Sequence, residues 1–225
     1  MNGILPVYKP QGISSYDVIR KFKRESGFKG KVGHGGSLDP FAEGVLLLLL
    51  NKATKKFDEI QLWQKSYRAT AILGAKSETL DSEGAIKKQI DCPVPKLEEI
   101  EFEARSMVGE LEQLVPLYSA AKYKGTPLYK LARQGKKVPL KTKWIHIYHI
   151  SIKKYEFPEL EFEADVSSGT YIRQLSYDLL KKLGVESYLK KLIRLSIGKI
   201  SLEATCQLDD FKDKNWRDFI LPINE

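Results

Sequence analysis

Residues 31–40 read KVGHGGSLDP, and the apolar run VLLLLL follows at residues 45–50. Three glycines within four residues give this loop access to backbone conformations that a side chain forbids. Pro40 lacks a hydrogen-bond donor and pushes Asp39 toward an extended backbone, so this carboxylate stands at a corner of the chain. The apolar run predicts a buried strand or helix segment directly after the loop. Asp39 is therefore a candidate site residue that is anchored to the core.

Two other interpretations of this loop remain open on the spacing alone. Most glycine-rich turns that end in Asp-Pro are only turns. Successive backbone N–H groups in such a loop also form concave sites for anions. The phosphate-binding patterns G-x-x-x-x-G-K-[ST] and G-x-G-x-x-G do not fit residues 33–39.

Length and composition indicate a globular protein that needs no disulfide bonds for stability. A chain of 225 residues suits one large domain or two small ones. Cys92 and Cys206 lie far apart and have no zinc-ligand spacing, which favours a reduced protein. The sequence shows no signal peptide, and its longest apolar run is far shorter than the roughly 20 residues that span a membrane. We therefore expect a soluble, cytoplasmic protein.

The positive charge of the chain is concentrated in one segment. Between residues 120 and 144 lie eight cations and no Asp or Glu. Without these eight, the 37 Lys and Arg residues fall to 29, which equals the 29 Asp and Glu residues. Tyr118, Tyr123, Pro127 and Tyr129 are interleaved with the cations, a composition typical of surfaces that meet phosphates and stacked bases. The segment predicts contact with nucleic acid, although many charge runs are only solvated faces.

The pattern of elements predicts an α+β protein, because helices and strands are interspersed without regular βαβ alternation. A capping box at Ser14 begins a helix that Gly27 ends, and alternation predicts strands over 66–75, 145–152 and 160–166. Residues 187–193 are predicted as a helix and 195–202 as a last strand. His146 and His149 invite a metal interpretation, which we reject because they would point to opposite faces of a strand.

Five separated motifs resemble one family in their order along the chain. They are residues 5–15 (LPVYKPQGISS), 33–40 (GHGGSLDP), 65–68 (KSYR), 115–120 (VPLYSA) and 169–173 (GTYIR). Together they resemble the bacterial tRNA pseudouridine-55 synthases, the TruB family, and the match covers nearly the whole chain. The combination is far more specific than any single motif.

The resemblance implies a pseudouridine synthase fold, with a mixed, largely antiparallel central sheet flanked by helices. It implies a catalytic domain over residues 1–207 that carries a basic, RNA-clamping insertion at about residues 116–143. Residues 208–225 would then form a short tail where family members usually continue into a C-terminal RNA-binding (PUA) domain.

The resemblance also implies an isomerase that converts the uridine at position 55, in the T-loop of tRNA, to pseudouridine. The base would be flipped out, detached from its ribose with the help of Asp39, rotated and rejoined through carbon. Asp39 matches the catalytic aspartate, and Arg173 matches an arginine that pairs with it. The other substrate-binding residues that match are His34, Tyr67, Tyr171 and Leu189.

No cofactor, metal, membrane or obligatory protein partner is implied; the partner is the T-arm of tRNA. The cations expected to bind it are Lys122, Lys124, Lys130, Arg133, Lys136 and Lys137. Two alternatives remain. The same chemistry could act on rRNA or on a guide-RNA-directed target, or the chain could be a non-catalytic RNA chaperone. Without the resemblance, Tyr67, Tyr171 and Leu189 would be interpreted as core or rim residues.

Overall fold

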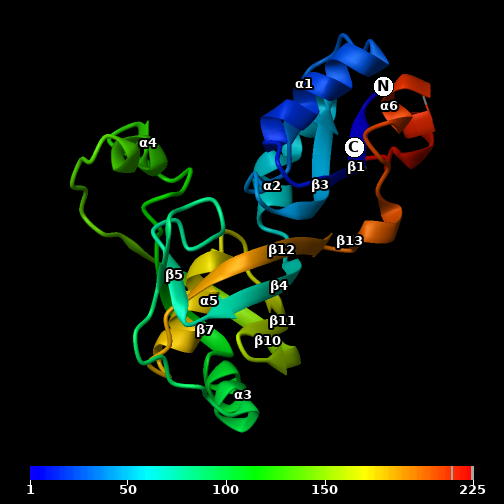
Figure 1. The fold of residues 1–225 in the computed structure, drawn as a ribbon. Helices are drawn as coiled ribbons and strands as arrows, with labels where there is room; N and C mark the ends of the chain where they lie inside the picture. The colour runs from blue at the N-terminus through cyan, green and yellow to red at the C-terminus, as the bar shows by residue number, and fades with distance from the viewer. Residues whose placement is uncertain (214, 224–225) are drawn as a thin grey trace. The chain divides into compact units, whose positions relative to one another are not determined.

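The apolar run after the glycine loop forms strand β3 (Glu43–Leu50) in the computed structural model, which describes residues 1–213 and 215–223. The chain divides into two compact units (Figure 1). Unit 1 consists of Met1–Arg68 and Leu192–Glu225, and unit 2 of Ala69–Lys191. Strands β4 (Lys65–Leu73) and β12 (Ser187–Ile197) each have residues in both units.

Unit 1 is organised around β3. Strand β1 (Gly3–Lys9) pairs with β3 in antiparallel fashion from Gly3↔Leu50 to Lys9↔Gly44. Strand β2 (Val32–His34) also pairs antiparallel with β3, from Val32↔Leu50 to His34↔Leu48. Strand β12 runs parallel to β3 at Arg194↔Gly44. The other elements of the unit are β1 (Gly3–Lys9), α1 (Ser15–Ser26), β2 (Val32–His34), η1 (Asn51–Lys56), α2 (Phe57–Gln61), β13 (Ile200–Ser201), η2 (Leu202–Ala204), α6 (Asp210–Asp213) and η3 (Asn215–Phe219).

Both faces of β3 are buried, which explains why its sequence is apolar without alternation. Leu46, Leu48 and Leu50 face a cluster formed with α1, β1 and the C-terminal residues. Val45, Leu47 and Leu49 face a second cluster on the other side. Full burial of such a side chain stabilises the fold by about 1.5–3 kcal/mol, so this strand is a rigid base for the loop before it.

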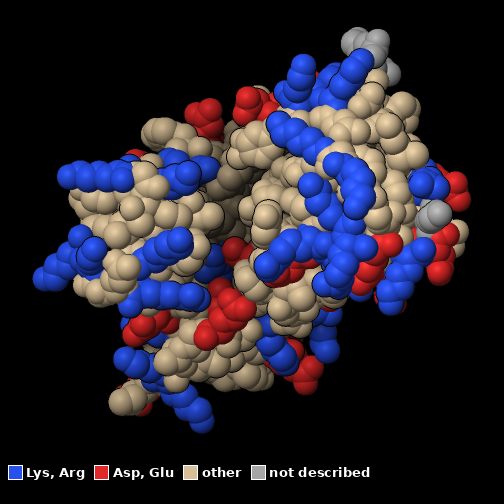
Figure 2. Space-filling model, turned by 90° about the horizontal axis from the view of Figure 1, so that it is seen from above, with Lys and Arg blue, Asp and Glu red and all other residues tan. Residues whose placement is uncertain are grey.

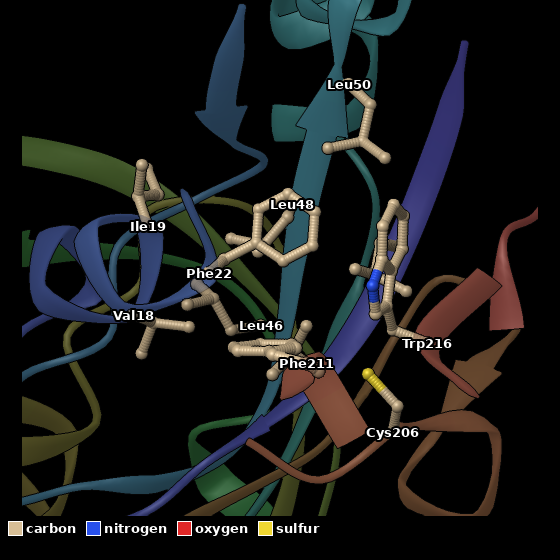
Figure 3. Packing of buried hydrophobic residues seen from close by; sticks show 11 residues of the cluster. Val18, Ile19, Phe22, Leu46, Leu48, Leu50, Cys206, Phe211 and Trp216 are labelled. Carbon is tan, nitrogen blue, oxygen red and sulfur yellow. The ribbon is translucent and has the colours of Figure 1, made fainter. Parts of the chain in front are cut away.

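The first cluster is completed by aromatic rings from distant parts of the sequence, whose side chains converge in Figure 3. The ring of Phe22 on α1 lies 4.9 Å from that of Trp216 and 5.1 Å from that of Phe211, both edge to face. Residues of the predicted tail 208–225 thus form part of the core of unit 1. Residues 214, 224 and 225 of that tail lie outside the described residues.

Unit 2 contains a sheet in the order β12-β4-β11-β10-β7. Strands β10 (Thr142–Glu156) and β11 (Glu159–Val166) form an antiparallel hairpin, and β7 (Gly109–Leu114) pairs antiparallel with the other edge of β10. Helices α3 and α5 pack against one another. The elements are β5 (Ala75–Ser77), β6 (Ile86–Lys88), α3 (Leu97–Ser106), β7 (Gly109–Leu114), β8 (Lys122–Tyr123), β9 (Thr126–Pro127), α4 (Leu128–Arg133), β10 (Thr142–Glu156), β11 (Glu159–Val166) and α5 (Ile172–Lys181).

Most predicted elements are confirmed, including the mixed, largely antiparallel α+β architecture. Helix α1 has the predicted capping box at Ser14 and a left-handed Gly27 at its end. The helix predicted over 187–193 is wrong, because these residues belong to β12. Their buried positions alternate as in a strand but slip by one between Leu189 and Leu192, and this slip imitates helical spacing. The domain boundaries predicted at 1–207 and 208–225 stay a prediction.

Candidate functional site

Asp39 lies in the loop between β2 and β3, and backbone bonds to β3 hold the start of this loop. The N–H of Gly35 donates to the carbonyl of Leu47 at 2.8 Å. A Cβ at Gly35 would lie 2.8 Å from Cγ2 of Ile60, so only glycine lets the loop lie this close to the core. After the corner, the N–H of Ala42 donates to the carbonyl of Asp39 at 3.1 Å.

Two side chains that come from before the loop in the sequence hold the residues next to Asp39. The buried hydroxyl of Ser15 accepts from the N–H of Leu38 at 2.9 Å and donates to the carbonyl of Leu38 at 3.2 Å. The buried ammonium of Lys9 donates to the carbonyls of Pro40, Pro10 and Ile13 at 3.4, 2.9 and 2.8 Å. The backbone on both sides of Asp39 is therefore fixed by buried groups.

Arg194 on β12 holds the loop from a third direction. Its guanidinium is buried and donates to the carbonyls of Val45, Ser37 and Gly36 at 2.7, 3.1 and 3.2 Å. These carbonyls lie on both arms of the loop, two before Asp39 and one in β3. One side chain thus connects the two arms.

His34 ends β2 directly before the loop. Burial, together with the positive charge of Arg194, lowers the pKa of its imidazole below the ordinary value of 6.5. The N–H of Gly36 lies 3.4 Å from Nδ1 of His34, which acts as the acceptor. Both observations favour a neutral ring at pH 7 that carries its proton on Nε2.

Tyr67 occupies the part of β4 that belongs to unit 1. Alternation along β4 puts it on the buried side of the strand with Ala69, Ala71 and Leu73. Three of the predicted site residues, His34, Asp39 and Tyr67, therefore belong to unit 1.

The other three belong to unit 2, where two of them share a buried network. Arg173 on α5 pairs with Asp81 (Nη1–Oδ2 3.2 Å), and both side chains are buried. Arg173 also donates to the carbonyls of Thr79 and Tyr118 at 2.5 and 3.0 Å. Leu189 is buried and forms a parallel bridge with Asp81. The predicted pairing of Arg173 with Asp39 joins residues of different units and stays a prediction.

Tyr171 stands at the N-cap of α5 and is fixed through its backbone. The buried amide of Gln113 accepts from its N–H at 2.8 Å and donates to its carbonyl at 3.1 Å. The ammonium of Lys143 lies 5.7 Å from the centre of the Tyr171 ring and donates to the carbonyl of Gly169 at 2.8 Å. Burial lowers the pKa of Lys143 from its ordinary value.

The basic segment, residues 116–143, leaves the sheet of unit 2 on long connections that carry the small hairpin β8–β9 and the helix α4 (Figure 1). The carbonyls of Ser119 and Ala121 accept from the N–H groups of Tyr129 and Leu128 at 3.1 and 2.7 Å. In Figure 2, Lys and Arg side chains lie over the left part, the side where Figure 1 shows α4, and over the right part as well. The six cations predicted to bind RNA are all exposed; they are Lys122, Lys124, Lys130, Arg133, Lys136 and Lys137.

Aromatic rings accompany these cations. Lys124 and Lys141 lie 5.6 and 5.5 Å from the centre of the Tyr123 ring, and Arg133 lies 5.8 Å from that of Tyr129. Such rings and cations together suit phosphates and unstacked bases.

Two classes of site find no candidate among residues 1–213 and 215–223. No group of three or more His, Cys, Asp and Glu side chains there could hold a metal ion, and His146 and His149 are both on β10. Within the same ranges, no helix combines the length and the apolar character needed to cross a membrane.

Sequence reasoning missed the buried side chains that hold the Asp39 loop, Tyr171 and Arg173 in place. Arg194, Lys9 and Gln113 are almost fully buried polar side chains, and a lone cation or amide in a sequence gives no sign of burial. Asp81 stands in an acidic stretch that is typical of a surface loop, yet it is buried. Lys9 and Ser15 did have a signal, since both lie in the first of the five motifs.

Known proteins are similar to this chain along most of its sequence. A family model described as "TruB family pseudouridylate synthase (N terminal domain)" matches residues 21–172. The chain is 43% identical over 225 residues to tRNA pseudouridine synthase B of Clostridium tetani, covering 100% of this chain and 78% of the relative. It is 39% identical over 231 residues to tRNA pseudouridine synthase B of Aquifex aeolicus, with coverage of 100% and 78%.

A solved structure extends the likeness to the fold. A chain in the crystal structure of a Cbf5-Nop10-Gar1 complex matches with a TM-score of 0.76 and 26% identity, covering 98% of this chain and 60% of that one. This chain thus spans less than two thirds of the solved chain. The resemblance seen in the five motifs, the pseudouridine synthase fold and the isomerase class are confirmed. The chain belongs to the TruB family of pseudouridylate synthases.

Proposed function

We propose that this chain isomerises the uridine at position 55, in the T-loop of tRNA, to pseudouridine, with Asp39 as the catalytic carboxylate. The name tRNA pseudouridine synthase B on relatives about 40% identical supports the substrate and the reaction. The observation that carries the proposal is the fixed backbone on both sides of Asp39, provided by Ser15, Lys9 and Arg194. A carboxylate held in this way acts without reorganisation at the moment of reaction.

The reaction exchanges one bond of the uracil for another. The bond between C1′ of the ribose and N1 of the base breaks, the base rotates, and a bond from C1′ to C5 forms. The proton on C5 leaves to water and N1 gains one, so no oxidant or cofactor is needed. Asp39 assists bond breaking either by attacking the nucleotide or by stabilising positive charge on the sugar.

The remaining predicted residues take binding roles. His34, neutral and placed at the start of the loop, contacts the nucleotide as it leaves the stack, and Tyr67 stacks on the base. Tyr171, Leu189 and Arg173 take substrate-binding roles in unit 2. The basic segment binds the T-arm through its phosphates. The enzyme acts in the cytoplasm and requires no obligatory protein partner.

The decisive measurement is tritium release from a tRNA transcript labelled at C5 of uridine, under single-turnover conditions. Wild-type protein releases tritium, and Asp39→Asn, which removes the charge at constant volume, lowers the rate by about 10³-fold or more. Asp58→Asn makes the same chemical change at an exposed position of unit 1 and keeps the wild-type rate. A transcript with cytidine at position 55 gives no release.

The same experiment separates the alternatives. The likeness to a chain from a Cbf5-Nop10-Gar1 complex favours the alternative in which the target is rRNA or is directed by a guide RNA. Failure to modify the naked transcript despite tight binding would favour that alternative, whereas equal folding of tRNA by wild type and Asp39→Asn with no tritium release by either would favour a chaperone. Release that persists in Asp39→Asn would remove the carboxylate from its role.

A further inference from the structure

Arg194 is a buried charge that neither the proposed chemistry nor the RNA surface requires. Its relative exposure is 1%, and it belongs to no motif that pointed to the reaction. A buried guanidinium is costly unless hydrogen bonds satisfy it. Here the partners are three carbonyl groups, and two of them precede Asp39 by only two and three residues.

The geometry of these bonds needs an arginine. Nε donates to the carbonyl of Val45 in β3, and the two terminal nitrogens donate to those of Ser37 and Gly36. A planar fork connects both arms of the loop at once, whereas the ammonium of a lysine is a single compact donor group. Replacing it by lysine therefore keeps the charge and removes the link.

The backbone of Arg194 is fixed just as closely. It pairs with Gly44 in the parallel bridge between β12 and β3. A Cβ on Gly44 would lie 2.3 Å from the carbonyl oxygen of Arg194, so glycine is the residue that permits this approach. The backbone position of Arg194 is thus fixed, and three hydrogen bonds fix its side chain.

We propose that Arg194 is a positioning residue for catalysis, whose guanidinium fixes the loop backbone so that Asp39 presents its carboxylate to the nucleotide in one orientation. The inference rests on the proposed function. Because Arg194 acts through the loop, its loss lowers the rate of the chemical step and leaves RNA affinity nearly unchanged. A displacement of about 1 Å at a catalytic group costs roughly 10²-fold in rate.

The test uses Arg194→Met and Arg194→Lys, with Trp216→Phe as the control. Trp216 lies in the core of unit 1 and contacts Phe22, so its substitution lowers stability without touching the loop. Four quantities are measured for each protein: melting temperature, dissociation constant for the transcript, single-turnover rate of tritium release, and amide hydrogen exchange of residues 33–42. Arg194→Lys carries the test if Arg194→Met does not fold.

The inference predicts faster exchange over residues 33–42 and a single-turnover rate about 10²-fold lower in both arginine variants, with the dissociation constant within about threefold of wild type. Trp216→Phe, at an equal or lower melting temperature, keeps the exchange of the loop and the rate. Unchanged loop exchange, or a loss of rate no larger than that of Trp216→Phe, would overturn the inference.

The two proposals fail separately. If wild-type protein releases no tritium from the transcript, the proposed function fails, and hydrogen exchange alone decides whether Arg194 fixes the loop. If wild-type protein is active and the arginine variants exchange and react normally, only the positioning role fails.

Discussion

The Asp39 loop and the basic segment are built in opposite ways. In the loop, buried side chains from three elements of unit 1, β1, α1 and β12, hold the backbone on both sides of the carboxylate. In the basic segment, Leu128 is the buried apolar residue of α4, and its six predicted RNA-binding cations are exposed. The loop thus has few charged residues and many hydrogen bonds to buried side chains, whereas the segment has many charged residues and few buried ones.

The difference follows from what each region does in the proposed reaction. A catalytic carboxylate must stand in one orientation, so the fold fixes it before the substrate arrives. A surface that follows a phosphate backbone benefits from long cationic side chains that adapt to it. Near its ends the segment is tied to the rest of unit 2, where Arg173 donates to the carbonyl of Tyr118 and Lys143 donates to that of Gly169.

The largest loss of stability is expected at Gly44, where β3 and β12 approach each other closely. Gly44→Ala puts a Cβ 2.3 Å from the carbonyl oxygen of Arg194 at a residue whose φ is +114°. The backbone strain and the clash together lower the free energy of unfolding by about 3 kcal/mol or more. Chemical denaturation measures this loss, and tritium release should fall with it because β12 moves away from the loop.

Gly27→Ala is the matched control for this prediction. Gly27 also has a positive φ, +68°, but a Cβ there meets nothing within 4 Å. Its substitution should cost only about 1 kcal/mol. Equal losses for the two variants would show that the close approach of β12 to β3 contributes nothing, and the rigid half of the comparison would fail.

The next effect concerns the adaptable region. Substituting Lys124, Lys130 and Lys137 by Gln removes three exposed cations from the basic segment. The transcript should bind about 10- to 100-fold more weakly at low salt, and the slope of its salt dependence should become shallower by roughly 0.7–0.9 for each phosphate that is no longer neutralised. The rate at saturating transcript should not change, since none of the three cations belongs to the loop. Filter binding over a series of KCl concentrations measures affinity.

A second triple variant separates local charge from net charge. Arg105, Lys153 and Lys154 are exposed on α3 and β10, and their substitution by Gln removes the same number of positive charges. Affinity for the transcript should then fall much less. If both triple variants weaken binding equally, the segment is no special surface and the contrast between the two regions disappears.

The sequence predicted the helices, strands and loop of both regions better than it predicted the buried side chains that hold them in place. The glycine pattern and Asp39 are local in sequence, and so are the alternation of β4 and the caps of α1. Arg194 is close to the loop only because β12 runs parallel to β3 after nearly 150 intervening residues. Such a pairing leaves no local pattern, and the slip in alternation along β12 even imitates a helix.

The packing of the C-terminal residues could not be predicted from the sequence either. The resemblance implies a short tail over residues 208–225, and within this range Phe211 and Trp216 complete the aromatic cluster on Phe22. Two aromatic residues in a polar stretch carry no periodicity, so their partners could not be predicted. For the residues around Tyr67, by contrast, alternation was enough to predict a strand.

A smaller effect tests the hydroxyl that supports the loop. Ser15→Ala leaves the N–H of Leu38 without the acceptor that now lies at 2.9 Å in a buried position. We expect a loss of about 1–2 kcal/mol in the free energy of unfolding and faster exchange of that amide. Ser15→Thr keeps the hydroxyl and serves as control. An unchanged exchange rate in Ser15→Ala would mean that Lys9 and Arg194 hold the loop without Ser15.

The smallest effect is electrostatic and is measured at His34. Burial first and Arg194 second lower its pKa below 6.5, so the folded protein resists a proton that the unfolded chain accepts. Stability should therefore fall as the pH drops through 6.5, and His34→Asn should abolish this part of the pH dependence. In NMR titrations, His34 should titrate below 6.5 in wild type and at higher pH in Arg194→Met, which lacks the neighbouring charge. An identical midpoint in the two proteins would show that the charge of the guanidinium does not contribute to the lowered pKa of His34, which burial alone would then explain.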